Sequence, residues 1–438
     1  MKKSILSIIA ATMLAVPVMA EDKKEKIDPN AESVSGMFKL MHILSAEDNQ
    51  FDRDSGSAFL LNVKYKSQAS NNIRAVVNHY SVGDTGLTDF ETTGKPARGM
   101  FVNGSTGRGE TVSLLAELHA LYKTKTTTAK VGRQIWNTPL STIKWSMMPN
   151  FYEGATFENK SVEGLTINAS HMTKMSYGSR ALTDFALIGE GSATAGASKV
   201  AKTNQAEFLT FGQLTGVTGI DGDDSAGMTT VGIDYSGVKN LTVRAWNYLV
   251  HDLESKLYAD AEYKMPLSKT TKLIIGAQYL DQDVDYSGIT GQTLTSNYSL
   301  TGAKVALKGK GFGFSVAMNE SSGDNAMLNI YGSDPAYTSM IFSRNAYRQN
   351  VSAYKVGASV GLMKGLKLKL AYANYGQSEG IASSNADAEE TDIVLIYHPN
   401  KKKNMMFKIF NALRTSENDT TANDKTMNHV RAVAYYKF

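Results

Sequence analysis

The chain ends in the stretch Val430-Arg431-Ala432-Val433-Ala434-Tyr435-Tyr436-Lys437-Phe438, in which two kinds of side chain alternate. Counting back from Phe438, every second residue is apolar or aromatic, and the interleaved set carries Lys437 and Arg431. Successive side chains of a β-strand point to opposite faces, so this stretch predicts a strand with one apolar face and one partly charged face. Chain ends usually fray, and a strand anchored on its last residue therefore needs a partner. A transmembrane barrel supplies one by pairing its last strand with its first, which leaves no edge in lipid.

The other end of the chain predicts export. Lys2 and Lys3 precede an apolar run from Ile5 to Val16, and Pro17 and the triplet Val18-Met19-Ala20 follow. This order is typical of a secretory signal cleaved after Ala20, and the run is too short to span a bilayer as a helix. An uncleaved anchor is the alternative. We therefore expect a signal peptide over residues 1–20, a short periplasmic segment over 21–35 and a barrel domain over 36–438.

The composition is unusual for a soluble core of this size. Mean hydropathy is −0.25, yet the chain has 21 tyrosines and 37 glycines. Barrels look only mildly hydrophobic because lipid-facing and lumen-facing residues alternate. Losing Lys2 and Lys3 lowers the formal charge from +4 to +2, so nucleic acid is not an expected partner. The absence of cysteine excludes disulfides, thiolate-metal sites and a cysteine nucleophile.

Period-two segments indicate an all-β, antiparallel barrel of about 18 strands. The expected strands are Gly36–Leu44, Ser57–Ser67, Asn72–Ser81, Glu110–Tyr122, Thr127–Ile135, Tyr152–Lys160, Leu165–Thr173, Met228–Ser236, Leu241–Val250, Lys256–Lys264, Thr271–Asp281, Asn297–Lys308, Gly311–Asn319, Asn350–Leu362, Leu366–Gln377, Glu390–His398, Asn404–Arg414 and Met427–Phe438. Gaps after even-numbered strands are short and gaps after odd-numbered strands are mostly long, with His251–Asp252 as the exception. Short periplasmic turns and longer external loops alternate in this way in outer-membrane barrels. The strand-like segment Ala206–Gly212 is placed inside the fourth long loop.

Strand number and facing predict a pore. Barrels of 16–18 strands leave an aqueous channel, and a charge on the lipid face near mid-membrane costs roughly 2–4 kcal/mol, so charged faces should line the lumen. The expected lumenal bases are Lys64, Lys66, Arg74, Lys130, Arg244, Lys367, Lys369, Lys408 and Arg431, and the expected lumenal acids are Glu117, Asp260 and Glu262. Tyr65, Tyr122, Tyr235, Tyr263, Tyr372 and Tyr436 are candidates for an interfacial aromatic girdle. The register between strands is not readable, so a basic ladder and a scattered polar lining both remain open.

The segment after the fifth expected strand is the most distinctive. Val131-Gly132-Arg133-Gln134 leads into Asn137-Thr138-Pro139-Leu140, then Met148-Pro149-Asn150-Phe151-Tyr152-Glu153-Gly154, and after a turn Gly164-Leu165-Thr166. This order resembles OprD-type outer-membrane porins, and similar sequences occur among major porins of ε-proteobacteria. The resemblance implies an 18-stranded porin whose third long loop folds inward and narrows the pore. The terminal Phe438 likewise resembles the signal by which the β-barrel assembly machinery recognises its substrates.

The third long loop has a composition that supports this implication. Trp136–Tyr152 carries two Trp, two Pro, two Met and Phe151, which is too apolar for a loop exposed to water. The loop should fold against the barrel interior; a lid across the top is the alternative. We expect Lys144 and Trp145 at the pore constriction, with Arg133 and Glu153 at its base. Family members commonly guide carboxylates along a basic ladder. Lys144-Trp145-Ser146 stands where family loops often place an acid and an arginine, which argues against transferring specificity for basic amino acids.

Catalysis is not expected. His119 shares a predicted face with Ser113 and Glu117, but one strand cannot supply the geometry of a catalytic triad. Asp281-Gln282-Asp283-Val284-Asp285 has calcium-like spacing without the glycine and glutamate of an EF-hand, so no metal or cofactor is assigned. A loose external cation site at these acids, or at Asp221, Asp223 and Asp224, stays open beside the expectation of solvated loop acids. Two functions remain: a channel for passive diffusion of small hydrophilic solutes and ions, possible substrates including amino acids or carboxylates, and a structural or adhesive surface barrel. Either would lie in the outer membrane of a Gram-negative bacterium among lipids and lipopolysaccharide, as a monomer or homotrimer.

Overall fold

The structure is a computed structural model that describes residues 28, 30–47, 56–85, 111–143, 146–178, 207–215, 225–285, 295–328, 331, 334–379, 387–400, 403–417 and 425–438. The chain divides into two units, Met1–Ala31 and Glu32–Phe438, and every strand lies in the second. The expected signal peptide over residues 1–20 lies outside the described residues.

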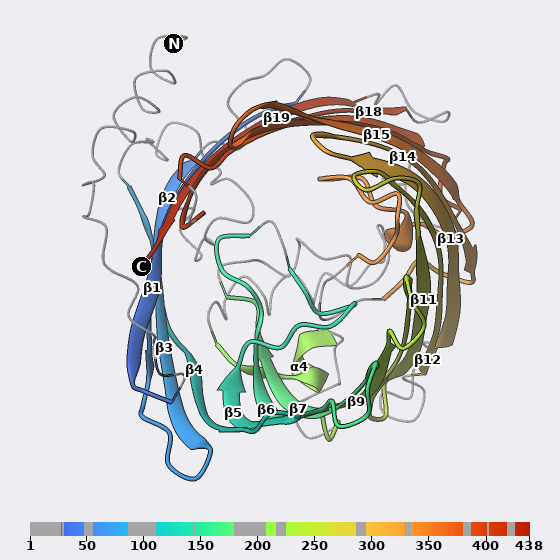
Figure 1. The fold of residues 1–438 in the computed structure, drawn as a ribbon. Coiled ribbons are helices and arrows are strands. Elements are labelled where there is room, and N and C mark those ends of the chain that lie inside the picture. The colour runs from blue at the N-terminus through green and yellow to red at the C-terminus, as the bar shows by residue number, and fades with distance from the viewer. Residues whose placement is uncertain are drawn as a thin grey trace. The chain divides into compact units, whose positions relative to one another are not determined.

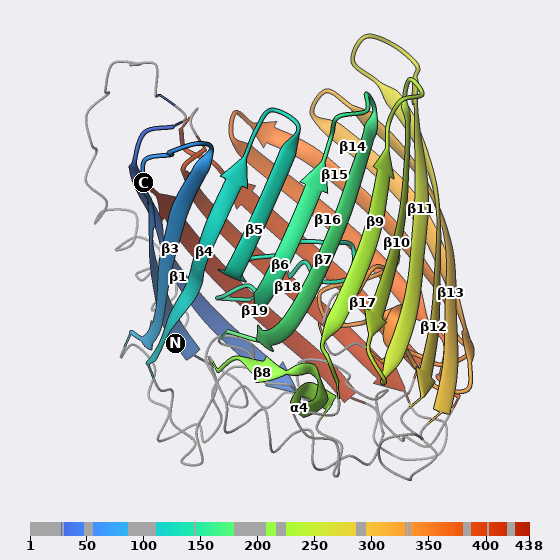
Figure 2. The same cartoon turned by 90° about the horizontal axis from the view of Figure 1, so that it is seen from below.

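The unit Glu32–Phe438 is a closed antiparallel barrel (Figure 1). Its strands are β1 (Ser33–Glu47), β2 (Gly56–Lys66), β3 (Ile73–Asp84), β4 (Val112–Lys123), β5 (Thr127–Gln134), β6 (Phe151–Asn159), β7 (Leu165–Ser176), β8 (Leu209–Thr210), β9 (Met228–Tyr235), β10 (Leu241–Val250), β11 (Glu254–Pro266), β12 (Lys272–Asp285), β13 (Thr295–Gly309), β14 (Phe312–Gly323), β15 (Ser352–Met363), β16 (Leu366–Tyr375), β17 (Asp387–Tyr397), β18 (Met405–Glu417) and β19 (Lys425–Lys437). The two-residue β8 pairs with the end of β7 (Figure 2), whereas β7 itself pairs with β9, so the wall has the predicted 18 strands. As predicted, β8 falls inside the fourth long loop.

The seam of the barrel joins its first and last strands. β1 pairs with β19 over eleven positions, from Met37↔Lys437 to Glu47↔Met427. Beyond them, the Gly36 N–H donates to the Phe438 carbonyl at 2.9 Å and the Phe438 N–H donates back at 3.1 Å. A Cβ at Gly36 would lie 2.5 Å from the Phe438 ring and 2.4 Å from the Asn62 carbonyl, so only glycine fits there. β1 begins at Ser33, inside the segment expected to precede the barrel.

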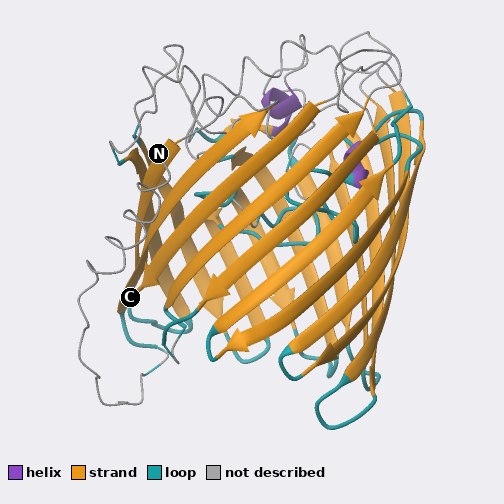
Figure 3. Cartoon of the chain, turned by 90° about the horizontal axis from the view of Figure 1, so that it is seen from above, coloured by secondary structure: helices purple, strands orange, loops and turns teal. Residues whose placement is uncertain are grey.

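The connections follow the predicted alternation. The strands run obliquely across the wall, with tight turns joining them at one end (Figure 3). Asn71 and Asn72 in the β2–β3 turn have φ of 48° and 66°, a left-handed conformation that asparagine tolerates. The helical elements described are α4 (Phe211–Thr215) and η2 (Asn345–Tyr347). Within the described residues, we find no helix with the length and apolar character needed to cross a membrane.

The outer face of the wall is apolar. Val131, Leu257 and Leu370 are 65%, 45% and 44% exposed, as the lipid-facing side of a transmembrane strand requires. Among the six tyrosines predicted for the interfacial girdle, Tyr436 is half-buried and the other five are exposed.

A β-bulge corrects one predicted facing. Uninterrupted alternation along the expected strand Glu110–Tyr122 predicts that Val112, Leu114 and Leu118 share a single apolar face. The β3–β4 register instead shifts between Asn78↔Glu117 and His79↔Leu115. Leu114 is therefore buried in the interior whereas Leu118 is 49% exposed on the outside. The prediction was wrong because an extra residue reverses the alternation of facing along a strand.

Candidate functional site

The described residues of the third loop, 135–143 and 146–150, cross the barrel interior (Figure 1). At its start the Trp136 ring lies 5.1 Å from Tyr152 and 6.4 Å from Tyr248 of β10, between ring centroids. At its far end Met147 and Met148 pack against side chains of β1–β4. The loop therefore folds inward, as predicted, and is anchored on two separate parts of the wall.

Two kinds of polar contact fix the course of this loop. The Lys39 ammonium of β1 donates to the Ser146 carbonyl at 2.7 Å. Near the start of the loop, the Ser141 hydroxyl donates to the Trp136 carbonyl at 3.0 Å and accepts the Thr138 N–H at 2.9 Å. These bonds satisfy backbone groups that burial removes from water, so the loop is held in one path.

A second loop also folds inward, which corrects the sequence prediction. The connection between β14 and β15, residues 324–351, was expected to be external. Its Ile341 packs with Val394 and Phe410 of the wall. The carboxylate of Glu390 accepts the N–H groups of Phe342 and Ser343 at 2.9 and 2.6 Å. The loop was missed because its anchors are wall carboxylates on β17, which sequence alternation reads simply as lumenal charge.

Between the two loops and the wall lies a cavity of about 1040 Å³. Its polar lining includes Arg244, Asp260, Lys367 and Lys369, all predicted as lumenal. Sequence reasoning missed other charged lining residues: Asp234, Lys304, Lys308, Asp334, Arg344, Lys355 and Asp392. Lys304 and Lys308 share one face of an expected strand, so a signal for them existed. No such sequence signal existed for Asp334 and Arg344, because they belong to the loop that was expected to be external.

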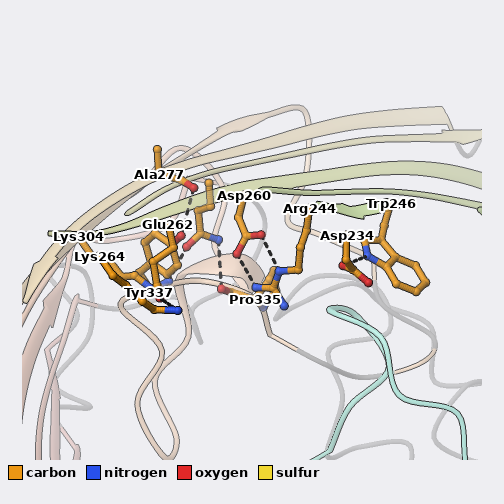
Figure 4. Close-up of polar contacts among 11 residues, drawn as sticks. Asp234, Arg244, Trp246, Asp260, Glu262, Lys264, Ala277, Lys304, Pro335 and Tyr337 are labelled. Atoms are coloured by element: carbon orange, nitrogen blue, oxygen red, sulfur yellow. Dashed lines mark hydrogen bonds and ion pairs between the residues drawn. The ribbon is translucent and has the colours of Figure 1, made fainter. Parts of the chain in front are cut away.

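On one wall of this cavity, bases are paired with acids (Figure 4). Arg244 Nε donates to Asp260 Oδ1 at 2.7 Å, and a second bond joins Nη2 to Oδ2. The Glu262 carboxylate forms ion pairs with the ammonium groups of Lys304 at 2.8 Å and Lys264 at 3.1 Å. Such pairing cancels most of the field that each charge would project into the channel.

The inward loop borders these pairs. The Lys304 ammonium lies 4.3 Å from the centroid of the Tyr337 ring. Gln278 of β12 donates to the Pro335 carbonyl at 3.1 Å and accepts the Tyr337 N–H at 2.9 Å, which fixes the loop beside them. In the same loop, burial raises the pKa of the Asp334 carboxyl, an effect that Arg344 opposes.

Another part of the lining carries lysines that form no ion pair with any acidic side chain in the described part of the chain. Lys308 of β13 and Lys367 and Lys369 of β16 all line the cavity, and Lys369 lies within electrostatic reach of the other two. Within the described ranges, none of the three forms an ion pair at 4.0 Å or less with an acidic side chain. This group, the lysine triad, leaves uncompensated positive charge beside the cavity.

The other predicted charges lie in separate groups. Lys64 pairs with the buried Glu117 at 2.7 Å, and Asn78 donates to the same carboxylate at 2.6 Å. Arg74 of β3 and Lys130 of β5 lie on the inward faces of the two strands that flank β4. Near the seam, the buried Arg431 of β19 covers the Phe410 ring at 5.0 Å, in the same inward region as Lys408. None of these residues contributes to the lining of the 1040 Å³ cavity.

Of the four residues expected at the constriction, the structure describes Arg133 and Glu153. Arg133 and Glu153 form an ion pair at 3.0 Å, and the Arg133 guanidinium lies 4.3 Å from the Phe208 ring. Arg133 is the cross-strand partner of both Leu118 and Glu153. Arg133 and Glu153 therefore share the outer face with Leu118 and do not line the cavity. Lys144 and Trp145 lie outside the described residues.

The arrangement suits passage of solutes and shows no preformed metal site. In the described part of the chain, no three His, Asp or Glu side chains gather closely enough to hold a metal ion. The cavity wall combines paired charges, free lysines and aromatic rings within a strand scaffold. Such a surface can attract, orient and release small polar solutes, since each contact is individually weak.

Comparison with known proteins gives a family and a fold. A family model described as outer membrane porin, OprD family, matches residues 91–438. Pseudomonas aeruginosa OpdK with vanillate is similar in structure, with a TM-score of 0.71 and 13% identity over 92% of this chain and 98% of that one. Pseudomonas aeruginosa OccK9 (OpdG) is similar with a TM-score of 0.70 and 16% identity, over 92% of this chain and 98% of that one. Acinetobacter baumannii OccAB4 is similar with a TM-score of 0.69 and 14% identity, over 94% of this chain and 100% of that one. No curated protein matches in sequence.

Proposed function

Since the chain belongs to the OprD family of outer-membrane porins, we propose that its channel favours small anionic solutes, carboxylates above all. The protein is a porin of the outer membrane that passes small hydrophilic solutes by passive diffusion. The lysine triad supports the preference for anions, because no described acidic side chain pairs with it, whereas another part of the lining pairs Arg244 with Asp260. Among the described lining residues, basic side chains also outnumber acidic ones. The similar structure of OpdK with vanillate, a carboxylate, is consistent with this class of substrate.

Planar-bilayer recording of the purified protein tests the proposal. Under a KCl gradient, the reversal potential should show that chloride permeates better than potassium. Proteoliposome swelling should be faster with monocarboxylates than with uncharged solutes of equal size and slowest with cationic amino acids. Cation preference in both assays would refute the proposal. A closed structural or adhesive barrel would instead show no conductance steps.

Three further expectations belong with this function. We propose that Phe438 is the residue recognised by the assembly machinery, that lipopolysaccharide surrounds the outer half of the barrel, and that the chain is of the ε-proteobacterial major-porin type. The last rests on the order of motifs from Gly132 to Gly154. Cross-linking and native-gel migration of the unboiled protein would distinguish a monomer from a homotrimer.

A further inference from the structure

A fully buried ion pair lies on the inward face of β11, outside the cavity lining. The Lys256 ammonium and the Glu254 carboxylate are 2.6 Å apart, and both side chains are 0% exposed. Taking two charges out of water is costly, so such a pair persists only where the remaining donors and acceptors are also bonded. The partners of this pair therefore indicate what it holds in place.

Its partners belong to the inward loop of residues 324–351. Lys256 donates to the Tyr331 hydroxyl at 3.0 Å and lies 4.5 Å from the centroid of the same ring. The second carboxylate oxygen of Glu254 accepts from Gln282 of β12 at 2.6 Å. Gln282 in turn donates to the Leu328 carbonyl at 2.8 Å and accepts the Leu328 N–H at 2.9 Å. The pair thus holds both Leu328 and Tyr331 against the wall.

Tyr331 also joins this loop to the third loop. Its carbonyl accepts a hydrogen bond from Asn150 at 2.8 Å, and its ring stacks on Tyr248 with 5.7 Å between centroids. The Tyr248 hydroxyl accepts the Leu140 N–H at 3.4 Å. Leu140 and Asn150 lie towards opposite ends of the third loop. One tyrosine therefore contacts, directly or through Tyr248, both loops that bound the cavity and the wall behind them.

We propose that Lys256 and Glu254 are positioning residues that set the size limit of the channel by fixing Tyr331 between the two inward loops. The proposal rests on the porin function and adds the determinant of solute size. Directional bonds from an ammonium and a carboxylate specify one loop position, whereas an apolar contact of equal volume would allow several. Because the pair does not line the cavity, it acts on solutes only through the loops.

The test compares Lys256→Met with Lys256→Arg and with Lys269→Met, a matched control in the exposed turn that follows β11. The readout is proteoliposome swelling with uncharged mono-, di- and trisaccharides. Lys256→Met should raise the trisaccharide-to-monosaccharide ratio at least about twofold, the lower end of what residues acting through a packed network achieve. Lys256→Arg should restore most of the wild-type ratio, and Lys269→Met should leave it unchanged.

Two measurements keep the test decisive. If Lys256→Met does not assemble into a heat-modifiable barrel, Tyr331→Phe removes only the hydroxyl that Lys256 contacts and should shift the ratio in the same direction. Reversal potentials should match wild type in every assembled variant, because the lysine triad is intact. A wild-type ratio in an assembled Lys256→Met, or in Tyr331→Phe, overturns the positioning role. If the wild-type protein shows no anion preference, the proposed solute class is overturned instead. The swelling rates with uncharged sugars do not depend on that preference, so the two proposals fail separately.

Discussion

Reversing the charge of Lys369 should change ion selectivity by an amount that follows from the cavity size. A sphere of 1040 Å³ has a radius of about 6 Å, so an ion at its centre interacts with one lining charge by about 0.7 kcal/mol in water. Screening in 0.1 M salt, where the Debye length is about 10 Å, reduces this to about 0.35 kcal/mol. Lys369→Glu then disfavours an anion by about 0.7 kcal/mol and favours a cation equally, a difference of about 1.4 kcal/mol. We expect the anion-to-cation permeability ratio to fall about tenfold.

The measurement is the reversal potential in a KCl gradient across a planar bilayer. Lys369→Gln removes one charge rather than reversing it, so it should produce half of the free-energy change, or about a threefold shift. Lys364→Glu in the exposed β15–β16 turn makes the same chemical change outside the cavity lining and should shift the ratio little. A Lys369→Glu channel whose ratio stays within about twofold of wild type would refute the assignment of this wall as the selective one.

Three other predictions follow from the loop, the wall and the seam. Because the pKa of Asp334 is raised, this carboxyl becomes neutral at a higher pH than an ordinary aspartate as the solution is acidified. Anion preference, read from reversal potentials across a pH series, should therefore increase as the pH falls through that raised value, and Asp334→Asn should remove the increase. Leu118→Arg places a charge on the lipid face and should lower stability in urea titrations in vesicles by up to about 2–4 kcal/mol; a wild-type midpoint would contradict the facing. Deleting Phe438 removes the two hydrogen bonds to Gly36, about 1–3 kcal/mol in total, and should reduce the heat-modifiable fraction on gels, whereas an unchanged fraction would show that the seam does not depend on them.

Strand number and most facings could be predicted because each depends on a local rule. Period-two alternation carries its signal within one strand, and the short turns carry theirs in a few residues. The error at Leu114 arose where this rule fails, because a bulge inserts one residue and the sequence around Ala116 gives no sign of it. The same alternation within β16 places Lys367 and Lys369 on one face, and both line the cavity.

The composition of the cavity could be predicted only in part, because it depends on which loops fold inward. The third loop was recognisable from its tryptophans and methionines, which would be costly to expose to water. The loop that carries Asp334 and Arg344 is instead held largely by backbone bonds to Glu390 and Gln278. Nothing in the residues of that loop states where those wall carboxylates and amides lie, so only the fold reveals it.

The two inward loops also explain how an 18-stranded barrel can be selective. Strand number alone would leave a wide aqueous channel. Here Trp136 and Tyr331 belong to one buried cluster with the inner face of β9–β13, while Met147 and Met148 cover part of β1–β4. These apolar contacts leave the 1040 Å³ cavity against β9–β17, where the paired charges and the lysine triad lie. Within that cavity a permeating solute passes close to charged side chains. An apolar interior filling therefore determines which wall the solute meets, and the charges of that wall determine which solutes it favours.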